Sequence, residues 1–156
     1  YVIDGKGAVT AHTNIVGNKL HLQGKATIEE VIVGVMFTSY LDLSTIMLKH
    51  DDGQGGYITD TEGKLMLRRV EVNFADTNNI VAEVLSRDRA FKYHLTGKTL
   101  GTTTLGEYSL KEGVFKIPIN GNSLSVSIRL MSNYPVGFNI VGYKWIGNYI
   151  KRTQGV

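Results

Sequence analysis

The chain has no cysteine and only two prolines among its 156 residues. Without cysteine, neither a disulfide framework nor a thiolate metal site can form. The longest apolar stretch, residues 31–37, is far shorter than the roughly 20 residues of a membrane-spanning helix. Neither sign of charge forms a long block, and a formal net charge of +3 argues against DNA binding as the main role. Stability must therefore come from packing or from assembly.

Glycine is abundant, with 18 residues, and Thr, Val and Tyr are frequent. This composition favours β-strands joined by tight turns. Short strand patterns without interleaved helical patterns predict an antiparallel β-sandwich or barrel-like domain with few or no helices. No repeat or linker divides the chain, so residues 1–156 are predicted to form a single β domain. Because the chain begins at Tyr1 and not at Met, we expect it to be part of a longer protein.

Several segments predict individual strands. Residues 29–38 (EEVIVGVMFT) are nearly continuously apolar and β-branched, which predicts a buried strand with helix as the main alternative. Residues 40–51 fit either two helical turns or a strand. Residues 79–86 and 90–97 predict two strands joined by the charged segment SRDR.

The pattern is clearest between residues 114 and 131. VFKIPING alternates apolar and polar residues up to Asn120-Gly121, which predicts a turn, and NSLSVSIRLM predicts a half-buried strand after it. Pro118 cannot donate a ladder hydrogen bond, so it predicts an edge strand or a bulge.

The run KLMLRRVEVNFAD changes phase in its middle. Leu65 and Leu67 share one phase, whereas Val70 and the alternate residues after it share the other. One extra residue in a strand shifts every later side chain to the opposite face. The pattern therefore predicts a β-bulge at Arg68-Arg69, with both guanidinium groups displayed near one point and available to pair with carboxylates.

No motif predicts catalysis, a cofactor or a metal. The loop DDGQGG, residues 51–56, lacks the spaced oxygen ligands of a helix-loop-helix calcium site, so we interpret it as a solvent loop. The segments GKG and TGKT lack the spacing of a phosphate-binding loop, and no GxSxG nucleophile motif is present. The histidines form no local ligand pair; they are His12, His21, His50 and His94.

The last two dozen residues hold the only tryptophan. Tyr143 and Trp145 share one phase of the last predicted strand, and Tyr149 continues it if the pairing survives Gly147. Packing in the core or in a subunit interface is the preferred interpretation, because each ring removes roughly 150 to 250 Å² from water. An exposed row would instead indicate a carbohydrate-binding module. Arg152 belongs to a basic end that is most simply a solvated terminus.

Three motifs resemble the tail nozzle proteins of short-tailed bacteriophages, also called the tail tubular protein B family. The final segment is similar to the family's closing pattern P-x-x-ϕ-ϕ-x-x-x-W-x-G-x-Y-x-x-R. The matching residues here are Pro135, Asn139, Ile140, Val141, Trp145, Gly147, Tyr149, Arg152 and the terminal Val156. GKLMLRRVEVNFADT resembles the family's G-[RK]-L-x-L-R-R segment, and VIVGVMFTS resembles an earlier strand. The ending Gln154-Gly155 departs from the usual basic residues.

The resemblance implies a structural role without catalysis or cofactor. It implies a nozzle subunit of the virion tail, assembled in the host cytoplasm, with this chain as the C-terminal part of a larger protein. The implied partners are further copies in a ring of six, the tail adaptor and tail fibre proteins, with DNA passing through unbound. Arg68, Arg69, Trp145, Tyr149 and Arg152 are the residues expected to hold the fold or contact a neighbouring subunit.

Overall fold

The computed structural model describes residues 2–4, 9–10, 14–17, 19–21, 31–35, 37–60, 63–96, 110–134 and 136–151. Within these ranges the regular structure is β-strand, apart from one 3₁₀ turn at Ser123–Ser125. All strand pairs formed by these residues are antiparallel. The predicted all-β antiparallel fold is confirmed. No helix within the described ranges is long and apolar enough to cross a bilayer.

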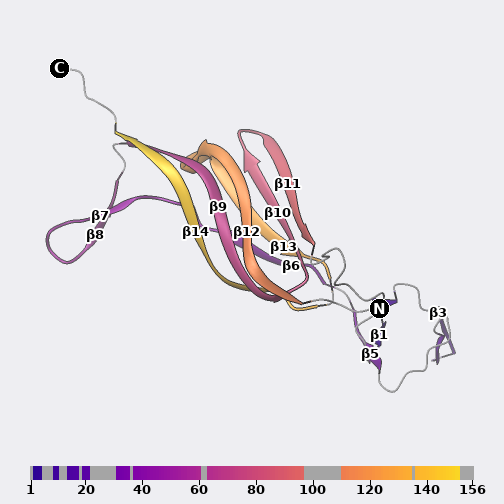
Figure 1. Cartoon of the computed structure of the whole chain (residues 1–156). Coiled ribbons are helices and arrows are strands. Elements are labelled where there is room, and N and C mark those ends of the chain that lie inside the picture. Colours follow the sequence, from indigo (N-terminus) through magenta and orange to yellow (C-terminus); the bar gives the residue numbers. More distant parts are fainter. Residues whose placement is uncertain are drawn as a thin grey trace.

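Two sheets form the body of the molecule (Figure 1). Sheet I has the strand order β11 (Arg89–Thr96), β10 (Asn79–Ser86), β13 (Val126–Ser132) and β6 (Ser39–Leu43). Sheet II has the order β12 (Lys111–Asn122), β9 (Gly63–Thr77) and β14 (Asn139–Lys151). The chain passes between the sheets after β9, β11, β12 and β13. Buried residues of both sheets form one core, so the two layers form a sandwich.

The core lies between sheet I and sheet II, where alternate residues of each strand point inward. It is built from β-branched and other apolar side chains, as the period-2 pattern requires. The fully buried members are Val70, Val72, Ile80, Ala82, Val84, Ile117 and Leu130. Trp145 and Tyr149 of β14 are partly buried and pack against this core.

The remaining strands are short and lie outside the sandwich. β1 (Val2–Asp4), β2 (Val9–Thr10) and β5 (Val31–Val33) form a small sheet, and β3 (Asn14–Val16) pairs with β4 (Lys19–His21). β7 (Lys49–Asp51) and β8 (Tyr57–Thr59) form a hairpin. Figure 1 shows this hairpin extending from one end of the sandwich and the β1–β5 region at the other end.

The prediction of a buried strand at residues 29–38 is wrong. Within the described part of this segment only Val31–Val33 is a strand, and Val35 and Phe37 are 94% and 77% exposed. An apolar run predicts burial only if another element covers it, and this segment belongs to neither sheet of the sandwich. The undecided residues 40–51 contribute strands and no helix, namely most of β6 and all of β7.

The predicted turn at Asn120-Gly121 is also wrong, although its residues adopt turn-like backbone. Asn120 has φ of 49°, yet β12 continues to Asn122, and its register with β9 shifts between Pro118 and Gly121. The pair therefore forms a bulge. The chain leaves sheet II at the 3₁₀ turn, where the Asn122 side chain accepts a hydrogen bond from the Leu124 amide. Pro118 lies on an edge strand beside this bulge, as predicted.

The β10–β11 hairpin is confirmed. Its register runs from Asn79 opposite Thr96 to Ser86 opposite Arg89, which leaves Arg87 and Asp88 as a two-residue loop. Both residues have positive φ, 46° and 64°. Positive φ at both loop positions is the pattern of a type I′ turn, whose twist matches that of the two flanking strands. The charged segment SRDR thus supplies the loop.

Candidate functional site

Four of the five residues singled out in the sequence lie on two neighbouring strands. Arg68 and Arg69 belong to β9, and Trp145 and Tyr149 belong to β14, which pairs with it along its whole length. Arg152 lies outside the described residues. Two segments far apart in the sequence, GKLMLRR and WIGNY, therefore meet side by side.

The bulge predicted in β9 is confirmed. Ile146 of β14 lies opposite Arg69 and Gly147 lies opposite Leu67, which leaves Arg68 as the extra residue on β9. Leu67 and Val70, on either side of the two arginines, both point into the core. As a result both guanidinium groups lie on the outer side of sheet II, where both residues are exposed.

Trp145 and Tyr149 lie on the inner side of β14. Trp145 is opposite Val70 and Tyr149 is opposite Leu65, so both rings cover the edge of the core. A Cβ on Gly63 would overlap the Tyr149 ring, so the ring occupies the space that this glycine leaves open. Because the two side chains are half-buried against the core, they do not form the exposed row that a carbohydrate platform needs.

Gly147 separates these two aromatic residues and permits a close strand approach. A Cβ at this position would lie 2.6 Å from the Met66 carbonyl oxygen and 3.2 Å from Leu67 Cα, both in the backbone of β9. Only glycine fits such an approach without displacing one strand. The glycine of the W-x-G-x-Y pattern thus sits directly beside the bulge of the L-R-R pattern.

The outer side of the β9–β14 pair holds a buried carboxylate that the sequence reasoning missed. Arg69 Nε lies 2.8 Å from Glu71 Oε1, and Lys144 Nζ lies 2.9 Å from Glu71 Oε2. The Glu71 side chain is only 5% exposed. The hydrogen bond from Lys144 is the main cause that lowers the pKa of Glu71, burial opposes it, and the Arg69 charge lowers it further.

A sequence signal for this cluster existed. In RRVEVNF, Glu71 shares the outward phase with Arg69, two residues before it on the same strand. Lys144 precedes Trp145 and therefore takes the opposite, outward phase on β14. The partner strand, however, could not be identified from the sequence alone.

The outer side of sheet I is arranged differently. One row crosses all four strands and contains Lys92, Glu83, Arg129 and Asp42 in order. Arg129 donates two hydrogen bonds to Asp42, of 2.6 and 2.8 Å, and Lys92 Nζ lies 3.2 Å from Glu83. The Arg129 hydrogen bond is the main cause that lowers the pKa of Asp42. Cations and anions alternate and balance along this row.

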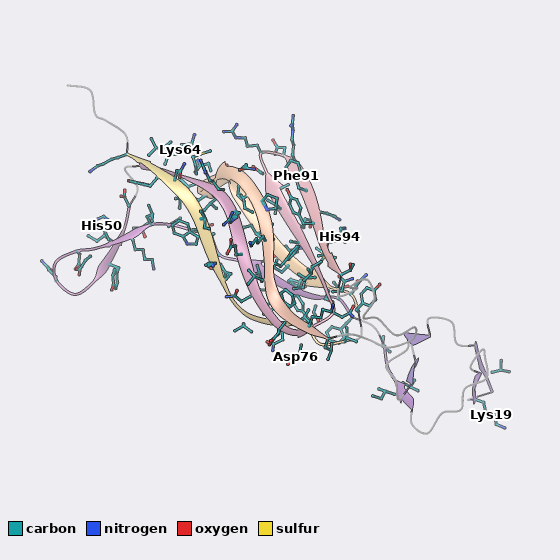
Figure 2. All side chains as sticks on the ribbon, viewed as in Figure 1. Lys19, His50, Lys64, Asp76, Phe91 and His94 are labelled. Carbon is teal, nitrogen blue, oxygen red and sulfur yellow. The ribbon has the colours of Figure 1, made fainter. Side chains whose placement is uncertain are left out.

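The DDGQGG loop forms the tip of the β7–β8 hairpin. Asp51 Oδ1 accepts a hydrogen bond from the Gly53 amide, and Asp52 Oδ1 accepts from the Gln54 and Gly56 amides, each at 2.8 Å. These carboxylates hold their own turn, which agrees with the solvent-loop interpretation. Among the described residues no three metal-binding side chains cluster. His50 and His94 are exposed and lie well apart, on the β7–β8 hairpin and on β11 (Figure 2).

Comparison with known proteins identifies relatives of this chain. The family described as bacteriophage nozzle protein matches residues 1–156. The chain is also 29% identical over 139 residues to tail tubular protein gp12 of Escherichia phage T7. That alignment covers 88% of this chain and 18% of the T7 protein, so the chain spans less than a fifth of its relative's length.

Proposed function

The chain belongs to the bacteriophage nozzle protein family, and from this membership we propose that it is a structural part of a phage tail. In this role it contributes to the wall of the tail tube through which DNA is ejected. The family match over all 156 residues carries the proposal. The pairing of β9 with β14 supports it, because the two motifs that most resemble the family hold each other in place.

The protein acts by assembly and not by catalysis. One β domain, residues 1–156, belongs to a longer subunit, and copies of that subunit form a ring of six in the virion. The ring contacts the tail adaptor on one side and tail fibre proteins on the other, and it is assembled in the host cytoplasm. The length of the T7 relative, of which this chain matches 18%, supports a longer subunit.

DNA passes through such a tube without specific binding. Each phosphate that a cation neutralises adds salt-dependent affinity, and that affinity would slow ejection. Along the charge row on sheet I, each cation is paired with one carboxylate. This outer side of sheet I therefore fits the wall of a passage for DNA better than it fits a DNA-binding surface.

Electron microscopy of the complete protein tests this function. We expect closed rings with six-fold symmetry and a central channel, and we expect antibodies against this chain to label the tails of intact virions. A glycan array with the same protein serves as the control for the carbohydrate-binding alternative. A protein that stays monomeric, is absent from virions and binds a glycan would refute the structural role.

A further inference from the structure

The β7–β8 hairpin exposes apolar side chains that its own molecule leaves uncovered. Its base is anchored, because Ile46 is buried in the core and Asp60 donates a backbone hydrogen bond to Leu48. Beyond the base, Tyr57 is 76% exposed and Ile58 is 52% exposed. Figure 1 shows the hairpin extending away from the two sheets. A two-stranded hairpin of this size is barely stable alone in water, so contact with another surface would stabilise it.

The tip of this hairpin is acidic. Asp51 lies opposite Tyr57 in the ladder, and Asp52 follows it in the turn. Backbone amides fix one oxygen of each carboxylate, and the hydrogen bond from Gln54 is the main cause that lowers the pKa of Asp52. The tip therefore presents two positioned negative charges beside an exposed aromatic ring.

The outer side of sheet II is basic, and we call its central part the basic face. Four cations lie on this face close to the carboxylate of Glu71 in the strand register. These cations are Arg68, Arg69, Lys116 and Lys144.

Two of the cations on the basic face are free to accept a carboxylate. Among the described residues, no acidic side chain forms an ion pair with Arg68 or Lys116. The exposed apolar side chains of Val114 and Ile146 lie on the same face. The basic face therefore combines unpaired positive charge with apolar surface, which complements the hairpin tip in both respects.

We propose that the β7–β8 hairpin tip of one copy docks on the basic face of a second copy of this chain. The proposal rests on the proposed function, because that function requires several copies to assemble. Asp51 and Asp52 would pair with Arg68 and Lys116, while the Tyr57 ring would stack on guanidinium or on the apolar residues of the face. The two docking surfaces differ, so repeating the contact closes a ring or extends a filament.

Charge reversal on each surface tests the contact in the complete protein. The tip variant carries Asp51→Lys and Asp52→Lys, and the face variant carries Arg68→Glu and Lys116→Glu. In each variant alone, like charges meet at every copy-to-copy contact. We expect self-association, measured by analytical ultracentrifugation, to weaken about tenfold or more in both.

Mixing the two variants provides the decisive measurement. The basic tip of the tip variant then meets the acidic face of the face variant. In the other contact, the unchanged acidic tip of the face variant meets the unchanged basic face of the tip variant. An alternating assembly with a one-to-one composition should form. The matched control for the face variant carries Arg87→Glu and Arg89→Glu in the β10–β11 hairpin. It changes the net charge by the same amount and sign as the face variant without touching either surface, and it should assemble as the wild type does.

Each outcome discriminates. If the wild type forms rings and either variant forms them equally well alone, or if the folded variants fail to assemble when mixed, the docking is refuted while the proposed function stands. If the wild type itself stays monomeric, both are refuted. If the face variant assembles normally but loses affinity for a short random-sequence DNA duplex, measured by fluorescence anisotropy, the basic face serves a nucleic acid and the docking is wrong.

Discussion

Gly147 is the position where the β9–β14 pair has least room. A Cβ added there would lie 2.6 Å from the Met66 carbonyl oxygen, closer than van der Waals contact allows. The obstructing atoms belong to the backbone of β9, which is held on its other side by β12. Neither strand can move aside as a flexible side chain would, so Gly147→Ala should displace β14 or distort the bulge.

The expected cost follows from this geometry. Overpacking a well-packed site costs about 1 to 3 kcal/mol, and a clash with backbone belongs at the upper end of that range. For a domain of this size, each kcal/mol lowers Tm by about 2 to 4 °C. We therefore expect Gly147→Ala to reduce the free energy of unfolding by about 2 to 3 kcal/mol.

Gly142 provides the matched control in the same strand. A Cβ at Gly142 meets no atom within 4 Å, so Gly142→Ala should be neutral or stabilise by up to about 1 kcal/mol through the unfolded state. Urea unfolding followed by circular dichroism measures both variants. If the two alanine variants unfold within about 0.5 kcal/mol of each other, steric exclusion at Gly147 is not the reason for its glycine.

Two further substitutions address the inner and outer sides of the same strand pair. Trp145→Ala should lower the free energy of unfolding by about 3 kcal/mol, the lower end of the range for a buried tryptophan, because this ring is only half-buried. Trp145→Phe should retain most of the stability. Equal unfolding midpoints for the two variants would contradict a packing role for the ring. Glu71→Gln should flatten the dependence of Tm on pH. Because Lys144 and Arg69 depress the pKa of Glu71 in the folded state, its contribution is complete above the ordinary value of 4.5 and is lost as the pH falls through the folded pKa. Parallel Tm curves for Glu71→Gln and the wild type, from neutral to acidic pH, would show that the cluster adds no pH-dependent stability.

The features that local patterns determine were predictable. The phase change around Arg68 and Arg69 located the bulge, because a period-2 pattern records every inserted residue. The loop between β10 and β11 was predictable because the charged residues SRDR separate two strand patterns. Trp145 and Tyr149 were expected to pack in the core or in a subunit interface, and they cover one edge of the core. Tyr149 keeps the phase of Trp145 because the pairing continues past Gly147.

The features that depend on a distant partner were not predictable. Asn120-Gly121 has the residues of a hairpin turn, but a bulge uses the same left-handed backbone, and only the pairing with β9 distinguishes the two. Phe37 lies in an apolar run that lacks a covering sheet. The burial of Glu71 depends on Lys144, which reaches it from a strand more than seventy residues later in the chain. A sequence pattern describes one strand at a time, whereas each of these features depends on which strand or sheet lies beside that strand.

The long separation between β9 and β14 has a consequence for the order of events in folding. Gly63 of β9 pairs with Lys151 of β14, so the ribosome completes the second strand long after the first. Pairing of distant segments is slow because loop closure must precede the contacts that reward it. Until β14 arrives, the Glu71 cluster lacks Lys144 and the basic face lacks Ile146. A subunit that has not finished folding therefore does not yet possess its complete outer surface, and the docking proposed above would select completed subunits.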